Sequence, residues 1–431
     1  MSRSIEEHAA SVRATIARGY DAATAGLELP LARARGAVLA RDLLAPISLP
    51  TFTNSQMDGF AVRTADLRAT GDEAFTLPVS ATQAAGAPPT TLAPGTAVAV
   101  MTGAALPAGA DAVVPVERVS PSSFDTDRIT ITRESAAGVL PGTYVRAQGS
   151  DVERGSVALS AGTVLGAAAL GACAALGLDG AATVSVRQGP SVLVVTGGDE
   201  VLTAGQPLKP GAIYDANGPL LESWLEEAGA SAVTTLSVTD APDEFSRRLR
   251  AAVDGEAPHL IVTSGGISAG AFEVVRLALE REAQMWFGHV AMQPGGPQGC
   301  GHYRGVPVVC LPGNPVSSWV SCEMFLRPAL AQVWGSCVPP RWASAVLTDP
   351  VRGLTGRSQL RRGLLEAGDD AAREPAVRCV GGASSHLLMS AARASVLLRI
   401  PAGDQEFPAG TRVDILPVSG GTIIGQETAN E

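Results

Sequence analysis

Between residues 190 and 333 the chain alternates between short apolar runs and longer amphipathic stretches. Runs rich in Val, Ile and Leu predict buried strands, and stretches with a period of about 3.6 residues predict helices. The predicted strands are 191–196, 233–238, 260–263 and 307–311, and the predicted helices are 219–228, 243–253, 272–282 and 316–333. Such alternation implies right-handed crossovers, so we predict an α/β unit with a doubly wound parallel sheet.

A β-rich pattern occurs on both sides of this region. From residue 50 to about 146, short Val- and Thr-rich runs such as 96–100 and 128–132 are broken by Gly, Pro, Ser and Asp. This pattern predicts a β-rich unit. After Pro339 and Pro340, the runs 396–400 and 411–416 predict a small terminal β barrel or sandwich.

The first fifty residues predict two helices separated by Leu29 and Pro30, the second spanning 31–44. A helix at about 163–176 and a strand at 182–186 follow the β-rich region. We therefore predict that the β-rich unit is inserted between two halves of one helical domain.

The composition limits the classes of partner. The net charge is −10, which argues against general affinity for nucleic acid or an anionic membrane surface. Lys209 is the only lysine, so the positive charge comes almost entirely from arginine. The planar guanidinium group suits bidentate contact with phosphate or other oxyanions, although genomic base composition also explains such a bias. Any anionic ligand must therefore be bound by a local group of residues.

The cysteines and the N-terminus indicate a cytoplasmic protein. The six cysteines are scattered, with no Cys-x-x-Cys pair and no zinc-like spacing, which is typical of free thiols in the cytosol. Glu6 and Glu7 occupy positions where a signal peptide carries positive charge, so export is not expected. The Ala- and Gly-rich stretch 161–178 is too weakly hydrophobic for a membrane span, and we interpret it as a buried helix.

Polar segments, most of them rich in glycine, follow the four strands of the predicted sheet, at 196–200, 239–240, 264–270 and 312–318. In open α/β sheets, ligands bind beyond the carboxyl ends of the strands, so these segments should form one rim. Glycines let backbone amides approach a ligand, which makes 264–270 and 312–318 candidate cradles for phosphate or an oxyanion. Each segment alone is equally well explained as a tight turn with a helix cap.

Several acidic residues are candidates for metal or substrate chemistry. Glu200 and Asp240 lie on the predicted rim and have the oxygen ligands that Mg²⁺ prefers, although either carboxylate alone is more often a helix cap or a solvated charge. Asp58 stands beside Gly59, which by itself is only a turn signal. Arg146 and Asp151 lie near a predicted domain junction, where a surface ion pair is the simpler interpretation.

Taken in order, these segments resemble the molybdopterin molybdotransferase family, which includes the C-terminal domain of gephyrin. Each motif alone is weak, but their order and spacing between residues 57 and 386 are highly specific. The matching segments are 57–60, 102–103, 149–151, 196–200, 214–217, 264–270, 292–295, 311–317 and 382–386.

The resemblance implies a homodimer of four-domain chains, with an active site between the α/β domain and the β-rich domain of the partner subunit. The expected domains are an elongated discontinuous one at 1–50 and 147–186, a β-rich insertion at 51–146, an α/β domain at 187–337 and a β barrel at 338–431. The implied reaction is Mg²⁺- and molybdate-dependent cleavage of adenylylated molybdopterin, which leaves molybdenum on the dithiolene and releases AMP. Other proteins of molybdenum cofactor synthesis are possible partners.

The resemblance also implies a set of functional residues. The expected catalytic residues are Asp58, Asp151, Glu200 and Asp240, and the expected magnesium ligands are Glu200, Asp240 and Glu273. We expect Ser268 and the glycine-loop amides to hold the pterin phosphate, and Arg146 with Arg362 to offset the charge of the oxyanion. The full set expected to bind substrate or anion is Thr102, Arg146, Ser264, Gly265, Gly266, Ser268, Gln293, Pro312, Gly313, Asn314, Pro315, Arg362 and Ser385.

The sequence also departs from the family pattern. Many relatives carry basic side chains where this chain has His289, Gln293 and Gly296, and an acid followed by Asp where it has Ala271 and Glu273. The sequence leaves open a scaffold that binds molybdopterin or a partner protein without turnover, and an enzyme that uses tungstate. A nicotinamide dehydrogenase is disfavoured, because no Gly-x-Gly-x-x-Gly turn follows the first predicted strand.

Overall fold

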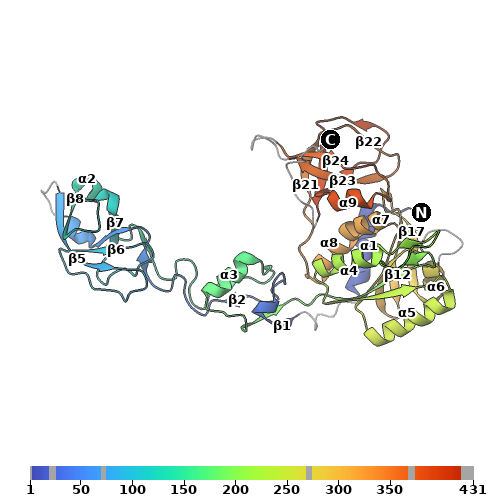
Figure 1. Ribbon diagram of the computed structural model, residues 1–431, viewed down its shortest axis with the longest axis horizontal. Coiled ribbons are helices and arrows are strands. Elements are labelled where there is room, and N and C mark those ends of the chain that lie inside the picture. Colours follow the sequence, from blue (N-terminus) through green and yellow to red (C-terminus); the bar gives the residue numbers. More distant parts are fainter. Residues whose placement is uncertain (1, 19–25, 69–73, 268–273, 367–373, 419–431) are drawn as a thin grey trace. The chain divides into compact units, whose positions relative to one another are not determined.

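The computed structural model describes residues 2–18, 26–68, 74–267, 274–366 and 374–418 (Figure 1). The chain forms two compact units, one of Glu28–Val184 and one of Met1–Leu27 with Ser185–Glu431. Within the described ranges, no helix combines the length and the apolarity needed to cross a membrane. The stretch 161–178 contains only the short helix α3 (Ala167–Ala175), of which Ala169 and Cys173 are buried.

A six-stranded sheet forms the centre of the larger unit. Its strands, in spatial order, are β15 (Ala232–Val238), β12 (Ser191–Gly197), β16 (Leu260–Ser264), β20 (Val306–Leu311), β19 (Pro297–Tyr303) and β17 (Gln284–His289). The first four are parallel, as predicted. Two further strands that the sequence analysis did not predict extend this sheet, and β19 pairs antiparallel with both β20 and β17.

The antiparallel pair has an unusual distribution of large and small residues. Phe287 on β17 lies opposite Gly299 on β19, and Met285 lies opposite Gly301. A Cβ atom on Gly299 would stand 2.6 Å from the Phe287 ring, so the ring occupies the space above the glycine. A strand containing two such glycines lacks the β-branched pattern that predicts strands, which is why the sequence did not indicate it.

Helices cover both faces of this sheet (Figure 1). On β12, Val192 and Val194 point to one face, and Leu193 and Val195 point to the other. The first face carries α1 (Ile5–Ala17), α4 (Asn217–Glu227), α7 (Pro315–Ser321), a π-helical turn (Cys322–Leu326) and α8 (Arg327–Val333). The second face carries α5 (Pro242–Glu256) and α6 (Val274–Glu282). Burial on both sides explains the continuous apolar runs in the sequence.

Helix α1 begins with a capping box in which Ser4 and Glu7 satisfy each other's backbone amides. Its buried residues Ile5, Val12 and Ile16 join the core of the sheet. Helix α1 therefore belongs to the unit that contains residues 185–431, whereas the sequence analysis grouped residues 1–50 with 147–186.

The predicted helix at 31–44 is wrong, because this segment is mostly extended and pairs with a distant part of the chain. The amides of Leu31, Leu39 and Leu49 donate to the carbonyls of Ala182, Thr163 and Val152. The short strands here are β1 (Leu27–Pro30), β2 (Leu43–Leu44), β10 (Val157–Leu159) and β11 (Thr183–Val186), paired as β1 with β11 and β2 with β10. Tertiary pairing thus overrides the helical propensity of an Ala-, Leu- and Arg-rich segment.

The β-rich character of residues 51–146 is confirmed. Five strands form one sheet in the order β7 (Ala112–Pro115), β4 (Gly59–Val62), β6 (Ala97–Val100), β5 (Ala74–Gln83) and β8 (Arg128–Thr132). The short strands β3 (Asn54–Ser55) and β9 (Val145–Arg146) form a separate pair beside it. Strands β4, β6 and β7 are buried along their whole length, which gives this region its own core.

The predicted C-terminal barrel is also confirmed. It closes through the strands β23 (Ser358–Glu366), β24 (Ala376–Cys379), β21 (Ala343–Leu347), β27 (Arg412–Pro417) and β25 (Val396–Ile400), because β25 pairs back with β23. The short strand β18 (Met292–Gln293) comes from the α/β region and pairs with the start of β23. This pairing joins the barrel to a loop that belongs to the candidate site.

A buried histidine predicts how the stability of this unit depends on pH. His8 on α1 is fully buried between Trp286 and Phe325, and neither ring nitrogen has a hydrogen-bond partner. Burial, and next the charge of Arg3, lowers the pKa of His8 to about 3. In the unfolded chain the pKa of this histidine is about 6.5. Above pH 6.5 His8 is neutral in both states and its protonation does not affect the free energy of unfolding. As the pH falls from 6.5 toward 3, the unfolded state binds the proton more readily, so the folded state loses stability.

We predict that His8→Leu removes this loss, which should reach about 2 kcal/mol at pH 5. The measurement is urea unfolding at pH 7.5 and 5.0, followed by the fluorescence of the five tryptophans, which all lie beyond residue 185. The same substitution at the exposed His386 serves as control. An equal pH dependence in wild type and His8→Leu would contradict the prediction.

Candidate functional site

The loops at the carboxyl ends of the four parallel strands converge on one pocket, as the sequence predicts. The pocket has a volume of about 420 Å³. It is lined by Gly197, Gly198 and Glu200 at and after the end of β12, Asp240 after β15, Ser264 to Gly266 at and after the end of β16, and Gly313 with Pro315 after β20. It lies where β15 and β16 flank β12 on opposite sides, which is the switch point of the sheet. Ligands of open α/β sheets bind at this position.

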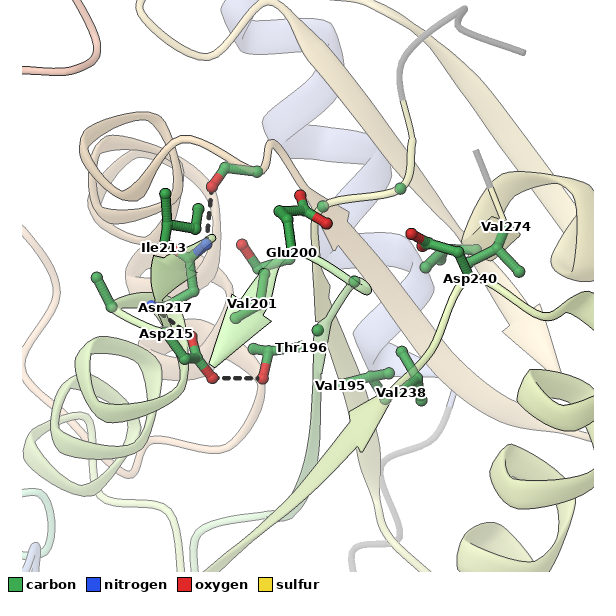
Figure 2. Close-up of a pocket in the computed structure, with 18 of the residues that line it drawn as sticks. Val195, Thr196, Glu200, Val201, Ile213, Asp215, Asn217, Val238, Asp240 and Val274 are labelled. Carbon is green, nitrogen blue, oxygen red and sulfur yellow. Dashed lines mark hydrogen bonds between the residues drawn. The ribbon is translucent and has the colours of Figure 1, made fainter. Parts of the chain in front are cut away.

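Two loops of this pocket are joined by reciprocal hydrogen bonds from backbone amides to side-chain carboxylates. The amide of Asp199 donates to the Asp240 carboxylate over 3.1 Å, and the amide of Asp240 donates to the Asp199 carboxylate over 3.2 Å. Gly197 permits this close approach, because a Cβ atom there would lie 2.2 Å from the carbonyl oxygen of Val238. Figure 2 shows the carboxylates of Glu200 and Asp240, two residues of the pocket lining, directed toward each other.

Asp215 is a pocket residue that the sequence analysis did not assign a role. Its carboxylate accepts hydrogen bonds from the Thr196 hydroxyl and from the amides of Asn217 and Gly218, each at 2.9 Å (Figure 2). It therefore ties the end of β12 to the start of α4. The Asn217 side chain donates to the carbonyl of Gly313 over 2.7 Å and adds the loop after β20. An Asp two residues before a helix was the available signal.

The first pocket is acidic. Its lining includes Glu200, Asp215 and Asp240, and none of its described lining residues is a lysine or arginine. In the described part of the chain, no three His, Cys, Asp or Glu side chains gather closely enough to bind a metal by themselves. Glu273, the third expected ligand, lies outside the described residues. Two carboxylates combined with substrate phosphates and water are the usual environment of Mg²⁺, so the residues present fit this ion.

A second pocket of about 540 Å³ lies next to the first and shares Gly265, Gly266 and Gly313 with it. The two loops touch, because a Cβ atom on Gly313 would stand 3.3 Å from the Cα atom of Gly265. A thin backbone wall therefore separates the pockets. Ser268, expected to bind the pterin phosphate, lies outside the described residues.

Two buried hydroxyl groups hold this wall together. Ser264 and Ser318 both donate to the carbonyl of Pro312, over 3.1 and 2.5 Å, and their oxygens lie 2.9 Å apart. Ser264 was expected to bind substrate, and it does line the first pocket. Its hydroxyl already has a backbone partner, so its evident role in this structure is to join the loop after β16 to the loop after β20.

The second pocket has the opposite electrostatic character. Among the described residues that line it, Arg357 is the one permanently charged side chain, and none is a carboxylate. The predicted residues Gln293 and Ser385 line this pocket, as do Pro312 and Asn314. The sequence analysis missed Arg357, because a lone arginine before a strand carries no distinctive signal.

Arg362 does not line either pocket, although the sequence analysis expected it to contact the oxyanion. Its side chain is fully buried and donates to the carbonyl of Gly382, while Nε and Nη1 have no partner. Burial, and then the neighbouring charge of Arg361, lowers the pKa of the Arg362 guanidinium. Arg362 therefore lies behind the loop that carries Ser384 and Ser385 and holds that loop in place.

The remaining predicted residues lie in the unit formed by Glu28–Val184. Asp58 and Thr102 are in contact, because the Asp58 carboxylate accepts from the Thr102 amide over 2.6 Å and from its hydroxyl over 2.7 Å. The hydroxyl and then the amide lower the pKa of Asp58. Arg146 pairs with Asn54 between β9 and β3, and Asp151 is exposed in a turn whose amide donates to Leu49.

Comparison with known protein families agrees with this architecture along almost the whole chain. Three family descriptions match: "MoeA N-terminal region (domain I and II)" at residues 3–177, "Probable molybdopterin binding domain" at 193–332, and "MoeA C-terminal region (domain IV)" at 344–418. A protein of Mycobacterium tuberculosis named molybdopterin molybdenumtransferase 2 is 41% identical over 423 residues, covering 96% of this chain and 99% of its own. The chain belongs to the MoeA family.

Other members of the MoeA family are similar over comparable lengths. The molybdopterin molybdenumtransferase of Haemophilus influenzae is 32% identical over 393 residues, which is 90% of this chain and 93% of that protein. A crystal structure of a molybdopterin biosynthesis MoeA protein from Pyrococcus horikoshii has a TM-score of 0.72 and 27% identity, and covers 97% of this chain and 99% of its own. The family expected from the order of the motifs is confirmed.

The Asp58–Thr102 contact predicts a measurable change in acidity. Thr102→Val removes the hydroxyl donor and keeps the amide donor, so the pKa of Asp58 should rise toward its ordinary value. Carboxyl ¹³C NMR titration of Asp58 in both proteins measures this shift. Thr53→Val, at another threonine of this unit, is the control, and an unchanged Asp58 pKa in Thr102→Val would show that the hydroxyl contact is absent in solution.

Proposed function

We propose that this chain inserts molybdenum from molybdate into adenylylated molybdopterin, with Mg²⁺-dependent release of AMP, to give the molybdenum cofactor. Membership of the MoeA family supports the reaction class. The observation that carries the proposal is the pair of adjoining pockets, one acidic with Glu200 and Asp240 and one without carboxylates but with Arg357, separated by Gly265 and Gly313. A substrate with a phosphate linkage at one end and an oxyanion acceptor at the other suits this arrangement.

The acidic pocket would hold Mg²⁺ between Glu200, Asp240 and the phosphates of the substrate, with Glu273 as a further expected ligand. When bound, the ion supplies charge neutralisation and polarises the phosphate bond that breaks. The chain's own residues position this end of the substrate. Asp215 holds the end of β12 next to the start of α4. The contact between Asp199 and Asp240 fixes the direction of the Asp240 carboxylate.

The second pocket would bind molybdate, which is a substrate of the reaction. Arg357 compensates its negative charge, and Gln293 and Ser385 offer hydrogen-bond donors from the same lining. Arg362 contributes indirectly by holding the loop before Ser385. The dithiolene sulfurs of the pterin are soft ligands that accept the metal, so the protein need only position the reactants and exclude competing ligands.

We also propose a cytoplasmic homodimer of four-domain chains, in which Asp58, Thr102, Arg146 and Asp151 of one protomer complete the pocket of another. Large apolar side chains exposed in the smaller unit are the candidates for this interface. Leu44 is 55% exposed, Phe52 45% and Leu140 60%. Large apolar side chains are exposed in the larger unit as well, among them Leu208 at 56%, so variants of both units are compared in the test of the dimer.

The first test replaces Glu200 with Gln, which removes one of two carboxylate charges from the proposed magnesium site. Transfer of molybdenum to pterin should fall by about 10- to 100-fold and recover partly at high Mg²⁺. The assay follows AMP release and pterin-bound molybdenum together, with Glu222→Gln on the exposed face of α4 as control. Undiminished transfer by Glu200→Gln would exclude Glu200 from the mechanism. If the wild-type protein binds pterin but shows no molybdate-dependent AMP release, the chain is a binding scaffold and not an enzyme. Competition between molybdate and tungstate identifies the preferred oxyanion.

The second test concerns the dimer. Light scattering should give a mass twice that of the 43.8 kDa chain. Leu140→Asp and Phe52→Asp should shift the protein toward monomers, since a charge buried in an interface without a partner is costly. Leu208→Asp, at an equally exposed leucine of the larger unit, is the matched control. A monomeric wild type at micromolar concentration would contradict the dimer.

A further inference from the structure

Three side chains at the wall of the second pocket form a hydrogen-bonded row. Arg361 Nη1 donates to Gln359 Oε1 over 3.3 Å, and Gln359 Nε2 donates to Gln293 Oε1 over 3.2 Å. The backbone of the row is fixed as well, because Gln293 pairs with Gln359 between β18 and β23, and Gln359 pairs with Ile400 on β25. Gln293 is the member that reaches the pocket lining.

The chemistry of the first member determines the orientation of the other two. A guanidinium group has only donors, so Gln359 must turn its carbonyl oxygen toward Arg361. Its amide nitrogen then faces Gln293, which must in turn offer its own carbonyl oxygen. The NH₂ group of Gln293 is left free of this row. The direction of both amides therefore follows from donor and acceptor identity.

Burial makes this orientation persistent. Gln359 is only 5% exposed, so water cannot easily replace either of its two partners. If the Gln359 amide were reversed, its NH₂ group would face the N–H donors of Arg361, and its carbonyl oxygen would face the carbonyl oxygen of Gln293. Leaving such buried groups unsatisfied costs more than a typical hydrogen bond gains, so the row has one strongly preferred polarity.

We propose that Arg361 and Gln359 are positioning residues that direct the NH₂ group of Gln293 into the second pocket, where it donates to the oxyanion. This inference rests on the proposed function of that pocket. A molybdate ion presents only acceptor oxygens, so an NH₂ group attracts it and a carbonyl oxygen repels it. Because Arg357 is the one permanently charged side chain of the described lining, the direction of a neutral amide matters for affinity.

The decisive variant is Gln359→Glu, which reverses the polarity of the row. The new carboxylate still accepts from Arg361 but can only accept from Gln293, so Gln293 must turn its NH₂ away from the pocket. We expect the Kd for molybdate, measured by calorimetry without pterin, to rise about tenfold. The KM for molybdate should rise equally, with kcat unchanged at saturation. Gln359→Met removes the row without reversing it and should give a smaller rise.

A double-variant comparison separates orientation from simple charge repulsion. In a Gln293→Met background no amide remains to turn, so adding Gln359→Glu should change the molybdate Kd little further. A tenfold effect that persists in this background would overturn the proposal, since it would come from the added charge alone. Thermal melts of each variant show whether it folds, and Gln359→Met provides the test if Gln359→Glu does not.

The outcomes also distinguish this inference from the proposed function. Equal molybdate affinity in wild type, Gln359→Glu and Gln359→Met would overturn the role of the row, while molybdenum transfer by the wild type would still support the function. Conversely, the wild type and the two variants could show the expected order of molybdate affinities while the wild type transfers no molybdenum to pterin. That result would overturn the proposed function and support the positioning role of Arg361 and Gln359.

Discussion

The contact between the loops after β16 and β20 is the constraint on which the rest of the site depends. Gly265 and Gly313 meet backbone to backbone, and the hydroxyls of Ser264 and Ser318 converge on the carbonyl of Pro312. Side chains at the two glycines would force the loops apart. Because the buried hydroxyls hold the loops together, two pockets of different chemistry can share one thin wall instead of occupying separate parts of the protein.

The two pockets on either side of this wall differ in charge because different parts of the fold supply their side chains. The carboxylates of the acidic pocket come from loops of the parallel sheet, and Arg357, Ser384 and Ser385 of the other pocket come from the barrel region. Strand β18 joins these regions, because its pairing with β23 brings the barrel beside the sheet. The closed barrel therefore places Arg357 next to the acidic loops of the sheet.

The sequence predicted most elements whose signals are local, and missed those that depend on distant partners. The strands and helices around β12 were predicted from the periodicity of apolar residues. The loops that line the pocket were predicted because the carboxyl ends of parallel strands lie at the same edge of the sheet. The helix expected at 31–44 is absent because that segment pairs with residues 152–182. Strand β19 was missed because its glycines replace the β-branched residues that indicate a strand. Within the site, the rim residues were predicted, whereas Arg357 and the burial of Arg362 depend on how the barrel folds back.

Under the proposed function, this acidic protein holds a small oxyanion against an unfavourable long-range field, since its net charge is −10. That field is screened over about 8 Å at physiological ionic strength, so short-range contacts decide the affinity. Arg357 attracts the oxyanion by its charge but constrains its position little. The Gln293 amide, whose orientation is set by Gln359 and Arg361, adds a directional hydrogen bond without adding charge. Such a site would release its oxyanion more readily than a cluster of cations, which suits an ion that must leave for the dithiolene.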